Sequence, residues 1–312
     1  MPGTYGYADP LFLLIAALAL ESYLGRVDWL GSLLAKPRGS LVRFARRLEQ
    51  RLNRPERDAA ERRRRGWLVA LLMISAAALA GWLLALVTRF YPFAWPLELL
   101  LLILLLRQRR TWEQGNALAV ALVRGDLQSA RSALMKLAGG DLDPLAAARL
   151  SRGSIASFGI VATARRLSDG LVSPVFWYVL LGPGGLALQQ MSLLLGRLFG
   201  DGALYGRLQE APAGVFAEGA LCIARLLEWL PSQMAALLLM GASFSVSAMS
   251  PPSLRAGAGS RQWPETLLMA ALGPPPHDGI ALRRALILFS RACILQLTLL
   301  ALLLLLRLIA LS

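Results

Sequence analysis

The sequence predicts an all-α protein that crosses a membrane several times, with about five to six membrane segments. Its 312 residues are 56% hydrophobic and 17% charged, whereas average globular chains are about 25% charged. The charges are also segregated, because long uncharged stretches alternate with basic ones and the net charge is +14. Disordered chains lack this apolar content, and two cysteines cannot staple a disulfide scaffold of this length.

Positive charge is densest at residues 36–65, which hold 12 basic and 4 acidic residues. Residues 68–88 follow without a charged side chain over 21 positions, and about 20 apolar residues cross a bilayer as a helix. Residues 93–106 are interrupted only by Glu98 and end at further arginines. We expect a hairpin whose basic ends face the cytoplasm. Residues 36–65 are then expected to meet the anionic headgroups of the bilayer, and no nucleic-acid partner is expected.

Four other apolar stretches complete the predicted membrane segments, at 11–24, 171–195, 230–249 and 285–306. Gly182-Pro183-Gly184-Gly185 interrupts the second of them, so this segment either crosses fully or forms a re-entrant pair of half-helices. Residues 1–10 contain no Lys or Arg, which argues against a cleaved signal peptide. We expect a multi-pass protein of the bacterial plasma (inner) membrane.

The chain is expected to form a single integral-membrane domain over residues 1–312. Residues 107–170 lack a membrane segment and predict a cytoplasmic helical insert. Gly125-Asp126 and Gly139-Gly140-Asp141 indicate helix ends within this insert. Residues 250–284 are rich in Pro and Gly and predict a loop.

Few residues carry recognisable chemistry. No metal ligand set is predicted, because Cys222 and Cys293 are isolated and His277 is the single histidine. Asp169 precedes an apolar stretch, where a helix N-cap is its ordinary role. Glu265 follows Trp-Pro and suits the first turn of a helix. Glu98 lies near the end of an apolar segment, where a functional role and a pair with an arginine are both open.

Three ordered segments resemble the integral membrane CobD/CbiB family of cobalamin biosynthesis, over residues from about 13 to 273. Residues 168–178, S-D-G-L-V-S-P-V-F-W-Y, are similar to the family's D-G-V-V-A-P-L-F-W-Y. Residues 227–232, L-E-W-L-P-S, are similar to its N-W-I-P-A segment. Residues 263–273, W-P-E-T-L-L-M-A-A-L-G, are similar to its W-P-E-A…A-G-A-L-G segment.

The resemblance implies an adenosylcobinamide-phosphate synthase. This activity joins aminopropanol, free or phosphorylated, to a carboxylate of adenosylcobyric acid as an amide, with ATP. Magnesium would accompany the ATP, a corrinoid would be the substrate, and no tightly bound cofactor is expected. Asp169 and Glu265 are then the candidate catalytic residues. The candidate substrate-binding residues are Arg165, Arg166, Ser173, Trp177 and Trp263.

The sequence also departs from the family pattern in one chemical direction. Arg165-Arg166 stand where the family has Glu-Asn, Ala224-Arg225 where it has two Asp, and Glu228 where it has Asn. Oxygen ligands have thus been replaced at several positions, while the Pro, Trp and Gly positions remain. AmpE, a membrane protein described as a modulator of β-lactamase induction, resembles the chain in similar segments. A non-catalytic membrane protein that binds a ligand or transmits a signal is therefore the alternative.

Overall fold

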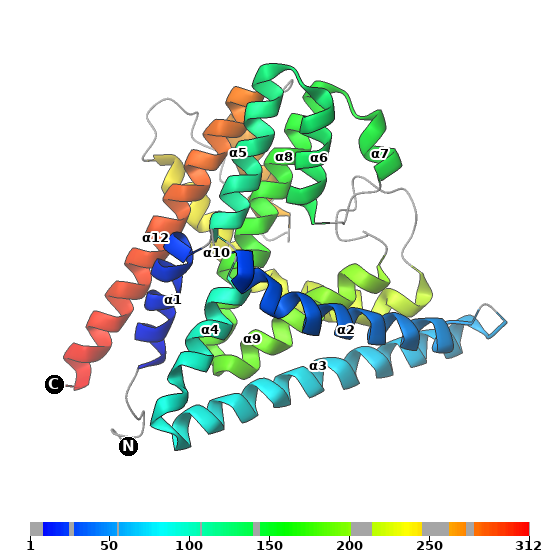
Figure 1. The fold of residues 1–312 in the computed structure, drawn as a ribbon, viewed down its shortest axis with the longest axis vertical. Coiled ribbons are helices and arrows are strands. Elements are labelled where there is room, and N and C mark those ends of the chain that lie inside the picture. The colour runs from blue at the N-terminus through cyan, green and yellow to red at the C-terminus, as the bar shows by residue number, and fades with distance from the viewer. Residues whose placement is uncertain are drawn as a thin grey trace. The chain divides into compact units, whose positions relative to one another are not determined.

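The computed structural model describes residues 9–24, 28–54, 56–106, 108–139, 144–200, 214–244, 262–272 and 278–311. Every regular element in these ranges is helical (Figure 1), which confirms the all-α prediction. The α-helices, in chain order, are α1 (Pro10–Leu24), α2 (Asp28–Leu52), α3 (Ala59–Phe90), α4 (Trp95–Leu105), α5 (Gln108–Arg124), α6 (Leu127–Ala138), α7 (Pro144–Arg149), α8 (Arg152–Leu167), α9 (Ser173–Phe199), α10 (Glu218–Phe244), α11 (Trp263–Leu272) and α12 (Gly279–Leu311).

Four helical stretches of the described chain are long and apolar enough to cross a membrane. They are Ala59–Phe90, Arg152–Phe199, Val215–Phe244 and Gly279–Ala310, and they confirm the polytopic prediction. Helix α4 has 11 residues and is about 16 Å long, short of the roughly 30 Å core of a bilayer. The segment 93–106 is therefore not a full-length crossing helix, and its first residues lie in the 3₁₀ turn η1 (Pro92–Ala94).

The chain divides into two compact units, each built from two separate stretches of sequence. Unit 1 comprises Met1–Leu105 and Pro174–Leu227, and unit 2 comprises Leu106–Ser173 and Glu228–Ser312. The single integral-membrane domain over residues 1–312 stays a prediction.

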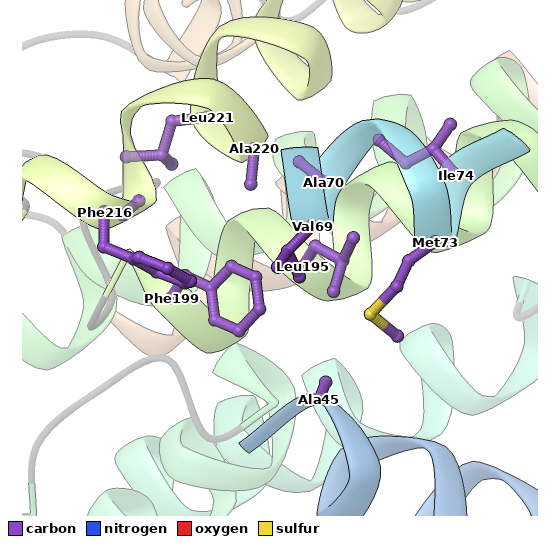
Figure 2. Packing of buried hydrophobic residues seen from close by; sticks show 11 residues of the cluster. Ala45, Val69, Ala70, Met73, Ile74, Leu195, Phe199, Phe216, Ala220 and Leu221 are labelled. Atoms are coloured by element: carbon purple, nitrogen blue, oxygen red, sulfur yellow. The ribbon is translucent and has the colours of Figure 1, made fainter. Parts of the chain in front are cut away.

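An apolar cluster on one face of α3 forms a core of unit 1 (Figure 2). Val69, Ala70, Met73 and Ile74 of α3 are buried in it, at the spacing of one helical face. Figure 2 also shows Leu195 and Phe199 from α9, Phe216, Ala220 and Leu221 from the start of α10 and the turn before it, and Ala45 from α2. The rings of Phe199 and Phe216 meet edge to face, with centroids 5.3 Å apart.

Helix α2 lies against this cluster with its apolar face. Leu41, Leu48 and Leu52 pack on the cluster at spacings of seven and four residues, which place them on one side of a helix. The opposite side exposes arginines, which are Arg43, Arg46, Arg47 and Arg51. Part of the basic segment 36–65 therefore belongs to an amphipathic helix that is anchored to the protein by its leucines.

Helices α5, α6 and α8 lie side by side in unit 2, and α12 packs on α5 and α8 (Figure 1). The described residues between 108 and 167 are thus largely helical, and the cytoplasmic insert at 107–170 stays a prediction. Gly125 is left-handed at φ 78°, and the Asp126 carboxylate then caps α6 by accepting from the Ser129 amide at 3.0 Å. These bonds from Ser129 lower the pKa of Asp126. Gly139 ends α6 at φ 76°, as the second predicted helix end requires.

The prediction of a loop at 250–284 is wrong in part. Residues 250–261 and 273–277 lie outside the described residues, but 263–272 form helix α11 and Gly279 begins α12. Pro264 and Glu265 suit a first helical turn, and Leu267, Leu268 and Ala271 supply its buried face. The Pro and Gly content of the surrounding residues obscured this short helix.

A charged site buried at a π-helical turn

Helices α8 and α9 are joined by a π-helical turn at Ser168–Val172. Such turns insert an extra residue into a helix and occur often at functional sites. The turn lies in the segment that resembles the family's D-G motif. Its surroundings hold five buried polar or charged side chains within nine positions, which are Arg165, Arg166, Ser168, Asp169 and Ser173. Charges at such depth are costly in a membrane protein and mark functional candidates.

Arg165 forms a buried ion pair with Glu265. Its Nε lies 3.1 Å from Oε1 of Glu265, and the two side chains are 6% and 13% exposed. Glu265 lies in the first turn of α11, and α11 packs against α8. The predicted first-turn position of Glu265 is thus confirmed. The structure brings together one candidate catalytic residue and one candidate substrate-binding residue from segments 100 positions apart in the sequence.

Arg166 faces a different neighbour. Its Nε donates to the Leu137 carbonyl at 3.0 Å, in the last turn of α6, where a cation also suits the negative end of the helix. The Gly139 turn lies beside the same guanidinium, because a Cβ at this glycine would be 2.0 Å from an Arg166 terminal nitrogen. This contact gives Arg166 a structural role at the end of α6, in addition to any role in binding.

Asp169 lies within the π-turn and is 6% exposed. The expected N-cap role of Asp169 is wrong, because the helical path continues from α8 through the turn into α9 and no helix begins there. The Ser173 hydroxyl, directly after the π-turn, and the Trp263 indole nitrogen, at the start of α11, are both buried. Neither has a hydrogen-bond partner among the described residues. Buried polar atoms of this kind cost about 1–3 kcal/mol each and suggest a missing ligand group.

Trp177 belongs to unit 1, whereas the other candidates belong to unit 2. Its indole nitrogen donates to the Leu227 carbonyl of α10 at 3.1 Å. In a helix this carbonyl would accept from the amide of residue 231, but Pro231 has none. Trp177 therefore satisfies a carbonyl that a proline leaves without its helical donor. This contact explains the residue structurally and does not place it with Asp169 and Glu265.

Two polar groups of unit 1 have surroundings that the sequence did not predict. Gln189 is fully buried in α9, and neither of its amide atoms has a hydrogen-bond partner among the described residues. Glu98 of α4 accepts hydrogen bonds from Tyr178 and Thr88. Tyr178 is part of the family-like F-W-Y segment, so its position was visible in the sequence. Its partner was not, because the two residues are 80 positions apart.

The described part of the chain contains no group of three or more His, Cys, Asp and Glu residues placed to hold a metal. Magnesium that arrives with ATP needs one or two carboxylates and takes its other ligands from phosphates and water. Asp169 and Glu265 are the two carboxylates that the candidate set contains. Glu265 already lies against the Arg165 guanidinium, which opposes a bound cation, so the fit is limited to Asp169.

These features define an all-α polytopic membrane protein with a charged site buried beside a π-turn. The family model described as CobD/Cbib protein matches residues 14–273. The chain belongs to the CobD/CbiB family.

The chain is also similar to curated proteins at modest sequence identity. A "Cobalamin biosynthesis protein CobD" from Sinorhizobium sp is 29% identical over 89% of this chain and 87% of its own length. The protein of the same name from Rhizobium meliloti (strain 1021) is 30% identical, over 59% of this chain and 55% of its own length. The protein of the same name from Stutzerimonas stutzeri (strain A1501) is 29% identical over 72% of this chain and 66% of its own length. No solved structure matches the chain significantly.

Proposed function

We propose that the chain acts in cobalamin biosynthesis as an adenosylcobinamide-phosphate synthase. The observation that carries this proposal is the set around the π-turn formed by the buried Arg165, Asp169 and Ser173 and the partly buried Glu265. It falls on two of the segments that resemble the family motifs. The names of the curated relatives support the pathway, and the family supports the reaction class.

The reaction replaces a carboxylate oxygen of adenosylcobyric acid by the nitrogen of aminopropanol or its phosphate. ATP with magnesium supplies the phosphoryl group that makes this oxygen a leaving group. Arg165 offers a guanidinium to a carboxylate or phosphate oxygen. Asp169 is the carboxylate that takes a proton from the ammonium, so that the neutral amine attacks the activated carbonyl and phosphate leaves. Ser173 and Trp263 offer donors to polar groups of the corrinoid, which accounts for their buried atoms.

Complementation tests this proposal in a strain blocked at the amide-forming step. The wild-type chain should restore growth that depends on cobalamin synthesis, and Asp169→Asn should abolish it. Asp126→Asn is the matched control, because that residue caps α6 outside the candidate site. The three proteins must reach the membrane in equal amounts. Lack of rescue by a well-expressed wild-type chain would contradict the synthase proposal.

A non-catalytic, AmpE-like protein is the second candidate. It is favoured by Arg165, which occupies a position where the family has a carboxylate and which neutralises Glu265. Such a protein would bind a corrinoid at the same buried set without turnover. Titration of the purified chain with adenosylcobyric acid separates the two proposals. Saturable binding without product formation in the presence of ATP supports the second candidate, and product formation excludes it.

The orientation proposal concerns the arginines of residues 36–65. We infer that they face the cytoplasmic leaflet of the bacterial inner membrane and contact its anionic headgroups, each arginine contributing about 1 kcal/mol. The exposed side of α2, with Arg43, Arg46 and Arg47, is the described part of this surface. A cysteine at position 46 should react with an impermeant reagent in inside-out vesicles only. Reaction in intact spheroplasts would contradict this orientation.

A further inference from the structure

Unit 1 contains a cavity of about 340 Å³ at the end of α3 that leads into the turn before α4. Pockets for small ligands begin at about this size. The groups along its wall that bear on a ligand are Glu98, Tyr178, Thr88, Arg89, Trp82 and Trp95. None of these residues belongs to the buried set around the π-turn, so the inference does not rest on the synthase proposal.

Glu98 is the acidic group of this cavity and is 7% exposed. The Tyr178 hydroxyl donates to its Oε1 at 2.5 Å, and the Thr88 hydroxyl donates to its Oε2 at 3.1 Å. A carboxylate has about four lone-pair sites, so these two bonds orient it without using its full capacity. A carboxylate held in this way at an apolar helix is costly, and it suits a ligand that carries positive charge.

The break in α9 adds further acceptors to the same wall. Gly182 has non-helical angles, with φ 66° and ψ −155°, and Pro183 has no amide to donate to the Val179 carbonyl. The half-helix that ends before Gly182 therefore presents carbonyl oxygens and the negative end of its dipole. Val179 and Gly182 both line the cavity. Carbonyl and carboxylate acceptors together match the three donors of a primary ammonium group.

Arg89 gives the cavity a second, positive pole. It borders the cavity together with Glu98, one residue after Thr88 in α3. A guanidinium repels an inorganic cation, but a ligand that carries both an ammonium and a phosphate can contact both charged groups. The indoles of Trp82 and Trp95 on the same wall add faces that attract cations.

The surroundings of the cavity indicate where such a ligand comes from. The turn between α3 and α4 exposes a group of aromatic side chains, Phe90, Tyr91, Phe93 and Trp95, and such groups mark the depth of lipid headgroups. Leu180 and Leu181 beside the cavity are more than half exposed and offer an apolar surface to acyl chains. A membrane lipid reaches this place from the bilayer without crossing water.

We propose that this cavity binds the head of a zwitterionic aminophospholipid, with the ammonium group at Glu98 and the phosphate at Arg89. Ethanolamine lipids carry the primary ammonium that the acceptors require. Choline lipids share the phosphate but have no N–H donors, and glycerol lipids have no cation. The site therefore discriminates among lipids by the ammonium group and holds all of them weakly by the phosphate.

Native mass spectrometry of the full chain in detergent tests the proposal with phosphatidylethanolamine, phosphatidylcholine and phosphatidylglycerol of equal acyl chains. The ethanolamine lipid should bind about tenfold more tightly than the other two, the effect of one charge-assisted hydrogen bond. Glu98→Gln should remove this preference, whereas Glu21→Gln, a control at another buried glutamate, should keep it. Equal binding of the three lipids to the wild-type chain overturns the proposal.

A second variant covers the case in which Glu98→Gln fails to fold. Arg89 is exposed, so Arg89→Gln tests the phosphate pole with little risk to the core. It should weaken the ethanolamine and choline lipids alike, and unchanged binding of both overturns the proposal. Soluble O-phosphoethanolamine distinguishes the source of the ligand. If O-phosphoethanolamine competes only weakly with phosphatidylethanolamine, the ligand is a lipid. If it binds as tightly as the lipid, the lipid assignment is overturned in favour of a free phosphoamine.

Discussion

Removal of Glu265 should destabilise the protein by leaving the Arg165 guanidinium buried without its partner. The two side chains are 6% and 13% exposed and 3.1 Å apart. Breaking a buried pair of this kind costs about 3–5 kcal/mol, and the partial exposure of Glu265 places Glu265→Leu near 3 kcal/mol. Replacing both partners by apolar residues of similar size is often neutral. The double variant Arg165→Met with Glu265→Leu should therefore regain most of the lost stability.

Stability is measured by chemical unfolding in detergent micelles, and function by complementation. The control pair is Arg109–Glu113, at 2.9 Å with 24% and 43% exposure. Its single variants should cost about 0.3–0.5 kcal/mol, as for exposed helix pairs. We expect the double variant at 165 and 265 to fold but to remain inactive, because the site needs the charges themselves. Full activity in the double variant would refute a catalytic or binding role of the pair.

Three further predictions test the structural contacts. Gly139→Ala should lower the free energy of unfolding more than Gly125→Ala. Both glycines have φ near +77°, where a Cβ costs about 1–2 kcal/mol, but only the Cβ at position 139 would clash with Arg166. Equal decreases in the free energy of unfolding would contradict this. Trp177→Phe should lower the free energy of unfolding by about 1–3 kcal/mol, because the Leu227 carbonyl loses its donor. Binding of adenosylcobyric acid should not change, and weaker binding would show that Trp177 contacts the substrate. Because the pKa of Asp126 is lowered, its carboxylate stabilises α6 above the unfolded value of about 3.9, and this effect is lost as pH falls through the folded-state pKa. The protection factors of the α6 amides, taken relative to the intrinsic exchange rate at each pH, should therefore fall on acidification in the wild type but not in Asp126→Asn.

Much of the fold follows from the sequence because bilayer solvation imposes long uncharged helices. The uncharged run 68–88 lies within α3, and the helix ends at Gly125 and Gly139 have the left-handed angles that such ends require. Helix α11 and the short α4 were harder to predict. The first sits among Pro and Gly residues, and the second lost its first residues to a 3₁₀ turn. Local rules of this kind decide helix ends more than hydrophobicity does.

The candidate site was predictable in composition but not in its pairings. The family-like segments contain Asp169, Ser173, Trp263 and Glu265, and Arg165 lies three residues before the first of them. The structure joins Arg165 and Glu265 in an ion pair. No local pattern couples residues 100 positions apart in sequence. The same limit hid the contacts that give Trp177 and Arg166 structural partners, since both depend on the packing of distant helices.

We propose above all that this chain forms the amide bond of adenosylcobinamide phosphate. The direct measurement incubates membranes containing the chain with adenosylcobyric acid, aminopropanol phosphate, ATP and magnesium, and detects the corrinoid product by mass spectrometry. Membranes with a relative that yields this product in the same assay serve as the positive control. We expect product that depends on ATP and is lost in Asp169→Asn. Absence of product from well-folded wild-type chain, under conditions where the relative is active, would contradict it.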